Sequence, residues 1–167
     1  GYGALYSNTT GANNTASGYY GLSSNTTGDR NIAIGYGAYD AADTEDDNLA
    51  IGYDALGGAI AGGVKNIAIG NYSLDANTSG INNTAIGYDA MTTNIGGDKN
   101  TSVGFQSLQA NTEGNKNVAI GMYSMYANTT AADNVAVGYE SMKVNTTGTR
   151  NIAIGYGAYD AADTESD

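Results

Sequence analysis

The chain contains no cysteine, histidine, proline or tryptophan, and only 6 of its 167 residues are lysine or arginine. Without cysteine there are no disulfides and no thiolate metal sites, so packing, hydrogen-bond ladders or oligomerisation must stabilise the fold. Without histidine and cysteine the usual general bases, nucleophile partners and transition-metal ligands are missing too. We therefore expect neither an enzyme nor a bound cofactor.

The shortage of positive charge also narrows the range of partners. The formal net charge is -11, whereas binding to nucleic acid or to anionic lipid requires clustered lysine and arginine. No apolar run approaches the roughly 20 residues that cross a bilayer, and no signal peptide is visible. The sequence thus predicts no nucleic-acid binding and no membrane insertion.

What the chain has instead is one short motif repeated from end to end. Successive units are 17 residues long, except for one unit of 18 residues at 48–65, and residues 1–13 form a partial unit. Repetition at a fixed short period is typical of a solenoid or array, in which each coil contacts only its neighbours. Residues 1–167 are therefore predicted to form a single tandem-repeat array. The full units begin at Asn14, Asn31, Asn48, Asn66, Asn83, Asn100, Asn117, Asn134 and Asn151.

Comparing the units position by position, with this asparagine as position 1, shows which columns are constrained. Position 5 is glycine in every unit, which indicates a corner with positive φ or no room for a Cβ atom. Position 3 is alanine, or serine at Ser102, and position 8 is alanine, serine or glycine. Such small residues indicate surfaces where another backbone comes close. Position 4 is nearly always isoleucine or valine and position 9 is leucine, methionine or tyrosine, so both columns are predicted to be buried.

The motif predicts a β-strand in the first half of each unit. Alternation and β-branched residues at positions 1–5 are typical of a strand, and glycine ends it after four or five residues. Positions 6–11 fit a second short strand or a tight turn, and the alternation there favours the strand. Positions 12–16 carry the asparagine, threonine and glycine of turns. We therefore predict an all-β fold, a parallel β-solenoid or β-roll of about ten 17-residue coils.

The small size of one coil bears on assembly. Each unit offers one isoleucine or valine, one leucine or methionine and a small-residue column, so a lone chain has a thin core. The alanine column faces away from the isoleucine column and also looks buried, which suggests a second interface. Three chains around an axis would bury both faces. A homotrimer is expected, with a monomeric or dimeric solenoid as the alternative.

The segment Asn83-Thr84-Ala85-Ile86-Gly87-Tyr88-Asp89-Ala90-Met91 and its equivalents resemble the N-T-A-I-G-Y-x-A-L repeats of phage tail-fibre-like proteins. The A-I-G core is also similar to the head repeats of trimeric autotransporter adhesins, whose units are shorter than seventeen residues. This resemblance covers the whole chain. It implies a trimeric, left-handed parallel β-roll in an extracellular fibre, a cell-surface adhesin or a virion fibre, with self-association and end-to-end filaments as the expected assemblies.

The aromatic column at position 6 is the main candidate for recognition. A row of tyrosines can stack on sugar rings of a cell-surface glycan, but it can equally fill a seam between chains. The candidate glycan contacts are Tyr36, Tyr53, Tyr88, Tyr139 and Tyr156. The asparagines at position 1 could also bind a ligand, but a ladder of stacked amides that hydrogen-bond from coil to coil explains them without one.

Charged side chains gather at the turns. Oxygen ligands for calcium could come from one acidic turn and its repeat near the end of the chain, although a solvated turn is the favoured interpretation. These residues are Asp43, Glu45, Asp46 and Asp47, and then Asp163, Glu165 and Asp167.

Position 17 carries a sparse basic stripe, which is expected to be a solvated column rather than a ligand site. It comprises Arg30, Lys65, Lys99, Lys116 and Arg150. The glycine pairs of the 18-residue unit, at 57–58 and 62–63, fit a bulge that absorbs the extra residue.

Several asparagines in the polar turns lie in N-x-S/T sequons. They could carry N-linked glycans in a secretory pathway, or could serve only as turn residues. The candidate glycosylation sites are Asn8, Asn25, Asn77, Asn128 and Asn145.

The repeat as a whole favours a structural segment, shaft or head of a fibre or surface adhesin. The alternative is a module that binds a glycan or host surface through the tyrosine column or the acidic turns.

Overall fold

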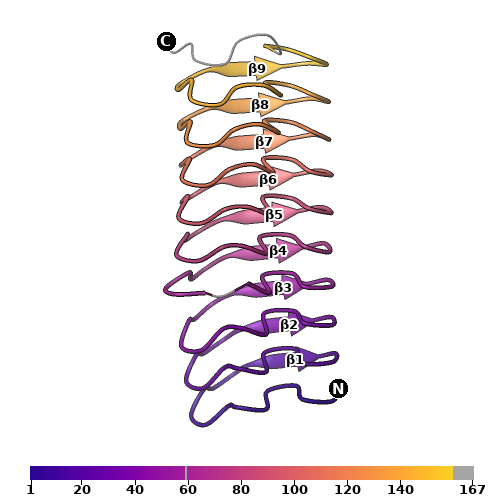
Figure 1. Ribbon diagram of the computed structural model, residues 1–167, viewed down its shortest axis with the longest axis vertical. Helices are drawn as coiled ribbons and strands as arrows, with labels where there is room; N and C mark the ends of the chain where they lie inside the picture. The colour runs from indigo at the N-terminus through magenta and orange to yellow at the C-terminus, as the bar shows by residue number, and fades with distance from the viewer. Residues whose placement is uncertain (59, 160–167) are drawn as a thin grey trace.

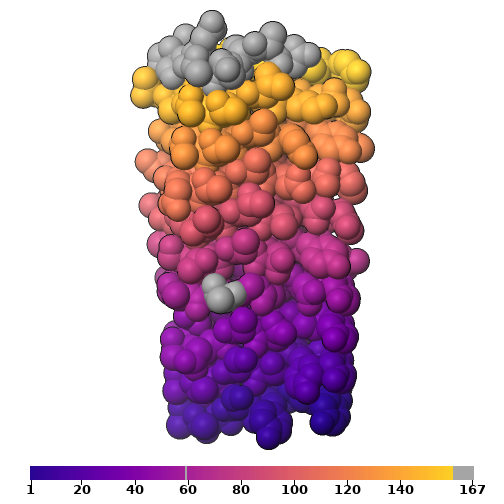
Figure 2. Space-filling model, in the orientation of Figure 1, coloured from indigo at the N-terminus to yellow at the C-terminus, as the bar shows by residue number. Residues whose placement is uncertain are grey.

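The computed structural model describes residues 1–58 and 60–159, which form an all-β parallel solenoid (Figure 1). Nine three-residue strands lie side by side in one sheet, in chain order, and each strand pairs with the next in parallel. Figure 2 shows the molecule as a column of nearly uniform width. The strands are β1 (Thr15–Ser17), β2 (Ile32–Ile34), β3 (Leu49–Ile51), β4 (Ile67–Ile69), β5 (Thr84–Ile86), β6 (Thr101–Val103), β7 (Val118–Ile120), β8 (Val135–Val137) and β9 (Ile152–Ile154).

The repeat period sets the register of the sheet. Each strand pairs with the residues one unit later, so that Ala85 of β5 lies between Ala68 of β4 and Ser102 of β6. The 18-residue unit keeps this register on both sides of its extra residue, because Gly58 N–H donates to the carbonyl of Asp75 and Ala61 N–H donates to the carbonyl of Thr78. The additional residue is therefore accommodated between positions 58 and 61. The glycine pairs 57–58 and 62–63, where a bulge was expected, bracket residue 59, which lies outside the described residues.

The core lies inside each coil, between the strand and the returning segment. The alanines of position 3 and the leucines and methionines of position 9 are buried, among them Ala85, Leu74 and Met91. The prediction for position 9 is confirmed. The small residues at positions 3 and 8 do mark a close approach of two backbones, since Ser124 Oγ donates to the carbonyl oxygen of Ala136 at 3.2 Å.

The prediction that position 4 is buried is wrong for the single chain. Ile34, Ile86 and Ile120 are 41%, 37% and 39% exposed. Because position 8 of the opposite wall lies within hydrogen-bonding distance of the strand, the inward-facing position 3 has room only for alanine or serine, and the larger residues at positions 2 and 4 point outward. Together these two columns form a surface that we call the outer sheet face. Position 2 contributes Thr15, Ile32, Leu49, Ile67, Thr84, Thr101, Val118, Val135 and Ile152, and position 4 contributes Ser17, Ile34, Ile51, Ile69, Ile86, Val103, Ile120, Val137 and Ile154.

The second half of each unit is a series of overlapping turns, so the prediction of a second strand is wrong. In the coil that begins at Asn66, Ser73 N–H donates to Gly70 O at 3.3 Å and Asn77 N–H donates to Leu74 O at 3.0 Å. Tyr72 and Leu74 adopt positive φ angles of 59° and 52°. Positions 8 and 9 are both buried, whereas a strand would bury only one of two consecutive side chains.

The glycine at position 5 forms the corner between these two halves. Gly87 has a φ of 140°, and a Cβ atom there would lie 2.4 Å from the carbonyl oxygen of Gly104 in the next coil. Both reasons expected from the sequence therefore apply at this position: an unusual backbone conformation and a neighbouring backbone in contact. The glycines of successive coils stack on one another, so the same corner recurs along the length of the solenoid.

Candidate functional site

The aromatic column at position 6 follows the glycine corner, at the side of Figure 1 where the arrows end. Tyr36 and Tyr53 stack with their ring centroids 5.1 Å apart and their planes 6° apart. Tyr19 and Tyr2 extend this stack in the preceding coils, at centroid separations of 5.1 Å and 5.6 Å. The coil spacing of a parallel sheet, roughly 4.8 Å, brings equivalent rings into contact in this way.

The other candidate glycan contacts lie in shorter stacks of the same column. Tyr88 stacks on Phe105 at 5.5 Å, and Tyr139 stacks on Tyr156 at 5.3 Å. Tyr36, Tyr53, Tyr88, Tyr139 and Tyr156 are 50%, 41%, 44%, 39% and 82% exposed, respectively. The five tyrosines thus present ring edges to the surface, distributed over three separate stacks.

Two further tyrosines bridge the gaps in this column, and the sequence pattern did not single them out. Asn71 and Met122 interrupt the aromatic residues at position 6, and each is followed by a tyrosine at position 7. Tyr72 lies edge-on between Tyr53 and Tyr88, with centroid separations of 5.4 Å and 6.0 Å. Tyr123 makes edge-on contacts in the second gap. The signal was present in the sequence, as an aromatic residue directly after each interruption.

Carboxylates lie beside this aromatic column. The carboxylate of Asp54 raises the pKa of the Tyr53 phenol, and the carboxylate of Glu140 does the same for Tyr139. Both effects are due mainly to repulsion between a carboxylate and the phenolate that would form. The column is therefore neutral on its rings and negative at its margin.

The asparagines at position 1 form a ladder through the solenoid. The backbone N–H of Asn100 donates to Oδ1 of Asn83 at 2.9 Å, and Nδ2 of Asn100 donates to the carbonyl of Gly114 at 2.8 Å. The first bond joins neighbouring coils and the second closes the coil to which Asn100 belongs. The same arrangement recurs along the ladder, so these amides have structural partners and are not open to a ligand.

A second ladder occupies position 12 and was not foreseen from the sequence. Asn94 Nδ2 donates to Asn77 Oδ1, and Asn111 Nδ2 donates to Asn94 Oδ1, both at 2.7 Å. Each of these Nδ2 groups also donates to the carbonyl at position 15 of its own coil. Turn asparagines are thus core residues here, a role that local turn chemistry alone does not indicate.

This ladder bears directly on the candidate glycosylation sites. Asn25, Asn77, Asn128 and Asn145 are fully buried, and their Nδ2 groups donate hydrogen bonds within the coil. A glycan attached to such a nitrogen would have no space in the folded protein. Asn8 is partly buried, and its Nδ2 donates to Gly11 O at 3.0 Å. The folded coil therefore disfavours glycosylation at all five asparagines.

The acidic turn at 43–47 uses its carboxylates within the fold. Glu45 is buried, and its side chain accepts from the backbone N–H groups of Asp43, Thr44 and Gly62 at 3.0–3.1 Å. Asp47 pairs with Arg30, which lowers the pKa of the Asp47 carboxyl. Within the described residues no group of three or more acidic side chains is arranged to hold a metal ion. The remaining candidates, Asp163, Glu165 and Asp167, lie outside the described residues.

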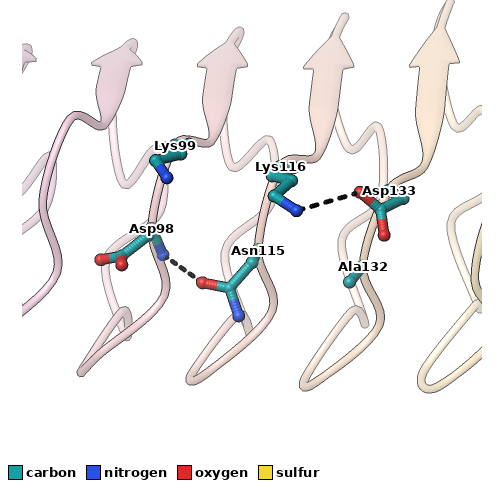
Figure 3. Close-up of a pocket in the computed structure, with 6 residues that line it drawn as sticks. All are labelled: Asp98, Lys99, Asn115, Lys116, Ala132 and Asp133. Atoms are coloured by element: carbon teal, nitrogen blue, oxygen red, sulfur yellow. Dashed lines mark hydrogen bonds and ion pairs between the residues drawn. The ribbon is translucent and has the colours of Figure 1, made fainter.

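The basic stripe follows the opposite edge, just before the strands. A hollow of about 400 Å³ lies there. Figure 3 shows the residues that line it, which are Asp98, Lys99, Asn115, Lys116, Ala132 and Asp133. Lys116 Nζ lies 3.9 Å from Asp133 Oδ1, and the backbone N–H of Asp98 donates to Asn115 Oδ1 at 2.7 Å. Opposite charges alternate around an exposed hollow, which is the arrangement of a solvated edge.

Comparisons with protein-family models, with curated proteins and with solved structures find no match. None of the described segments forms a helix with the length and apolar character needed to cross a membrane. Three surfaces of the solenoid are candidates for a functional role: the outer sheet face, the aromatic column with its acidic margin, and the basic edge.

Proposed function

We propose that this array is a rigid structural segment of a fibre and that it assembles with copies of itself through the outer sheet face. The observation that supports this most strongly is the exposure of that face, which runs the full length of the nine-stranded sheet. Contiguous exposed apolar surfaces of this extent mark sites of association in soluble proteins. A shaft or head segment needs such a lateral contact along its whole length.

Charge and geometry favour a second copy as the partner. The outer sheet face contains only isoleucine, leucine, valine, threonine and serine, although the chain as a whole has a net charge of -11. Since acidic residues lie on the other surfaces, copies can meet here without opposing like charges. Equivalent rows recur at every coil, so faces from different copies can match in register along the axis. Three copies around one axis form the homotrimer expected from the resemblance to tail-fibre and adhesin repeats.

The resemblance also supports an extracellular setting, at a cell surface or in a virion fibre. The proposed role is mechanical and needs no catalytic group. Hydrogen-bond ladders along the axis and a continuous core suit a stiff rod, and the resemblance also implies end-to-end filaments.

The test compares two exposed apolar positions on different faces. Ile120 on the outer sheet face and Val144 on the opposite wall are 39% and 38% exposed. Native mass spectrometry should give three times the chain mass for the unchanged protein and for Val144→Asp, but a single chain mass for Ile120→Asp. Circular dichroism should retain the β signal in both variants. A single chain mass for the unchanged protein would overturn the proposal, and a much larger mass would indicate filaments.

A second candidate function is recognition of a cell-surface glycan by the aromatic column. The specific observation in its favour is the uninterrupted, half-exposed stack that contains Tyr19, Tyr36 and Tyr53. A sugar can pack against the exposed ring edges of such a stack and hydrogen-bond to its phenol hydroxyls. Replacing Tyr36 and Tyr53 together with alanine should abolish binding to a glycan array while the thermal midpoint falls only slightly. If unfolding accompanies the loss, the rings serve packing and the glycan hypothesis fails.

A further inference from the structure

The aromatic column brings the phenol rings of two successive coils face to face. Tyr36 follows strand β2 and Tyr53 follows strand β3, and their ring centroids lie 5.1 Å apart with the planes 6° from parallel. Because the two residues occupy the same position of adjacent units, equivalent ring atoms lie about one coil spacing apart, roughly 4.8 Å. The Cε atoms, which are ortho to the two hydroxyl groups, are therefore neighbours.

Both rings are accessible from solvent and lie outside the core. Tyr36 and Tyr53 are 50% and 41% exposed, whereas the leucines and methionines of position 9 are buried in the interior. Exposed side chains rotate about their torsions within picoseconds to nanoseconds. The two rings can therefore leave the stacked arrangement and bring their Cε atoms to bonding distance without a change in the coil.

The coils that carry this pair lack the amide ladder of position 12. Ala42 stands at that position in the first of the two units, and Ile60 takes the equivalent place in the second, because the neighbouring Ala61 N–H donates to the carbonyl at position 13 of the following coil. Asn25 Oδ1, which would accept from the next amide of the ladder, is buried without a hydrogen-bond partner. A covalent bond between Tyr36 and Tyr53 would join the coils where this ladder is interrupted.

We propose that Tyr36 and Tyr53 are a site of oxidative cross-linking, at which a dityrosine bond joins the coils of β2 and β3. The co-reactant is a one-electron oxidant, such as a haem peroxidase with hydrogen peroxide. The chain has 14 tyrosines and no cysteine, so this bond provides the covalent connection between coils that a disulfide cannot provide here.

The reaction needs no group beyond the two phenols and the oxidant. Each phenol gives one electron to the oxidant and its hydroxyl proton to water. The two phenoxyl radicals then form a bond between their Cε atoms, and the hydrogen of each of these carbons moves to the phenol oxygen as the rings regain aromaticity. In sum, one C–C bond forms and two C–H bonds break. The two electrons and two protons released reduce hydrogen peroxide to water.

Other stacks of the column provide a matched comparison within the same chain. Tyr88 and Phe105 are stacked at 5.5 Å with planes 10° apart, and they are 44% and 39% exposed. Phenylalanine has no hydroxyl proton to lose, so this stack should remain without a cross-link. Tyr139 and Tyr156 stack at 5.3 Å and 9° with a phenol on both rings, and the same chemistry is expected there.

Treatment of the full chain with peroxidase and limiting hydrogen peroxide tests the proposal. Dityrosine fluorescence should appear, and the mass of the denatured chain should fall by two hydrogens for each bond. Cleavage of the unfolded product after Glu45 separates the two tyrosines, so mass spectrometry should find one peptide with Tyr36 joined to one with Tyr53. Tyr53→Phe keeps the ring and should abolish this linked pair. Phe105→Tyr should add a new linked pair that contains Tyr88.

Thermal unfolding gives a second readout of the same bond. The treated protein should have a higher thermal midpoint than the untreated protein, because a cross-link between coils restricts the unfolded chain. Treated Tyr53→Phe should gain less, since it retains only the bonds formed elsewhere. Circular dichroism of the untreated variants checks that each one folds.

The proposal is wrong if the oxidised protein contains no peptide that joins Tyr36 to Tyr53. It is also wrong if all the dityrosine joins different chains, which would double the mass under denaturing conditions. Failure to gain a link in Phe105→Tyr would show that the parallel stack does not direct the coupling. These results concern bonds within one chain, and they are independent of self-association through the outer sheet face.

Discussion

The hydroxyl of Tyr39 accepts a hydrogen bond of 2.5 Å from Nδ2 of Asn48, inside the solenoid. Tyr39 is fully buried, and this burial raises the pKa of its phenol far above the usual value, with a smaller effect from the Glu45 carboxylate. In the same unit Ala42 stands at position 12, where most units have asparagine. In this unit tyrosine thus replaces the usual leucine or methionine at position 9, and alanine replaces the usual asparagine at position 12.

This pairing predicts strong coupling between Tyr39 and Ala42. Tyr39→Leu should lower stability by about 2–4 kcal/mol, because it removes a buried ring and leaves a cavity. Ala42→Asn alone should also destabilise, since the ring leaves no space for an amide. The double variant restores the common pattern, in which Asn25 Nδ2 donates to the carbonyl of Gly28. Denaturant unfolding should show the double variant more stable than the sum of the single changes by about 1–3 kcal/mol.

The asparagine ladder predicts a large cost for a small truncation. Asn100→Ala leaves the backbone N–H of Asn117 without its buried partner and removes one of the two side-chain donors to the carbonyl of Gly114. At about 1–3 kcal/mol for the unpaired N–H and about 1 kcal/mol for the lost hydrogen bond, the free energy of unfolding should fall by roughly 2–4 kcal/mol. Asn115→Ala is the control, because its side chain lies at the exposed edge, and it should cost under about 1 kcal/mol. Equal losses in the two variants would contradict a structural ladder.

The stacked glycines predict that alanine is tolerated at some glycines and excluded at others. Gly87→Ala would place Cβ 2.4 Å from a backbone oxygen at a φ of 140°, so we expect a loss of at least about 3 kcal/mol. Gly21→Ala is the matched change, since its Cβ would meet its neighbours at 3.7–3.8 Å and other units have alanine there. This second variant should be neutral or slightly more stable. Thermal melts of the two proteins provide the measurement.

Stability should increase when the solution is made mildly acidic. Asp40, Asp54 and Asp75 have pKa values raised above 3.8, chiefly by burial, so the folded state binds more protons than the unfolded state above that pH. Unfolding free energy therefore rises as the pH falls from 7 towards about 4. Below that, the lowered pKa of Asp47 acts in the opposite direction, because its pairing with Arg30 is lost.

Thermal midpoints at pH 7, 5 and 3 check this expectation. The midpoint should be higher at pH 5 than at pH 7, because the raised pKa values of the three carboxyls favour their protonation in the folded state. Asp75→Asn should raise the midpoint at pH 7 and reduce the difference between the two conditions. A midpoint that falls steadily from pH 7 to pH 5 would show that burial and repulsion of these carboxylates are too weak to matter.

The sequence was sufficient for the solenoid because its period, its corner glycines and its strand pattern all agree. It was misleading about which strand face is inside. Ile86 is the larger apolar residue, yet Ala85 is buried, because the distance between the strand and the returning segment decides what fits. That distance depends on the overlapping turns after the corner. The residues with positive φ in these turns include tyrosine, leucine and methionine, which rarely adopt that conformation, so the local sequence does not indicate the turns.

The candidate site was predictable only in part for a related reason. The aromatic column followed from simple spacing, but the place of Tyr72 between two neighbouring rings depended on its backbone conformation. Lys143 Nζ lies 5.4 Å from the ring centroid of Tyr123, and this contact joins different positions of adjacent coils, so reading down one column does not find it. Contacts that cross columns require the three-dimensional stacking.

Because the nine strands share one register, the length of this molecule changes in steps of one coil. Adding or deleting a whole unit keeps the asparagines of position 1 and the glycines of position 5 opposite equivalent residues, and changes the length of the rod by roughly 4.8 Å. Adding one residue is tolerated only where a loop can hold it, as between positions 58 and 61. Recombination between units can therefore lengthen or shorten such a rod under selection for its length, without any change in the packing of its interior.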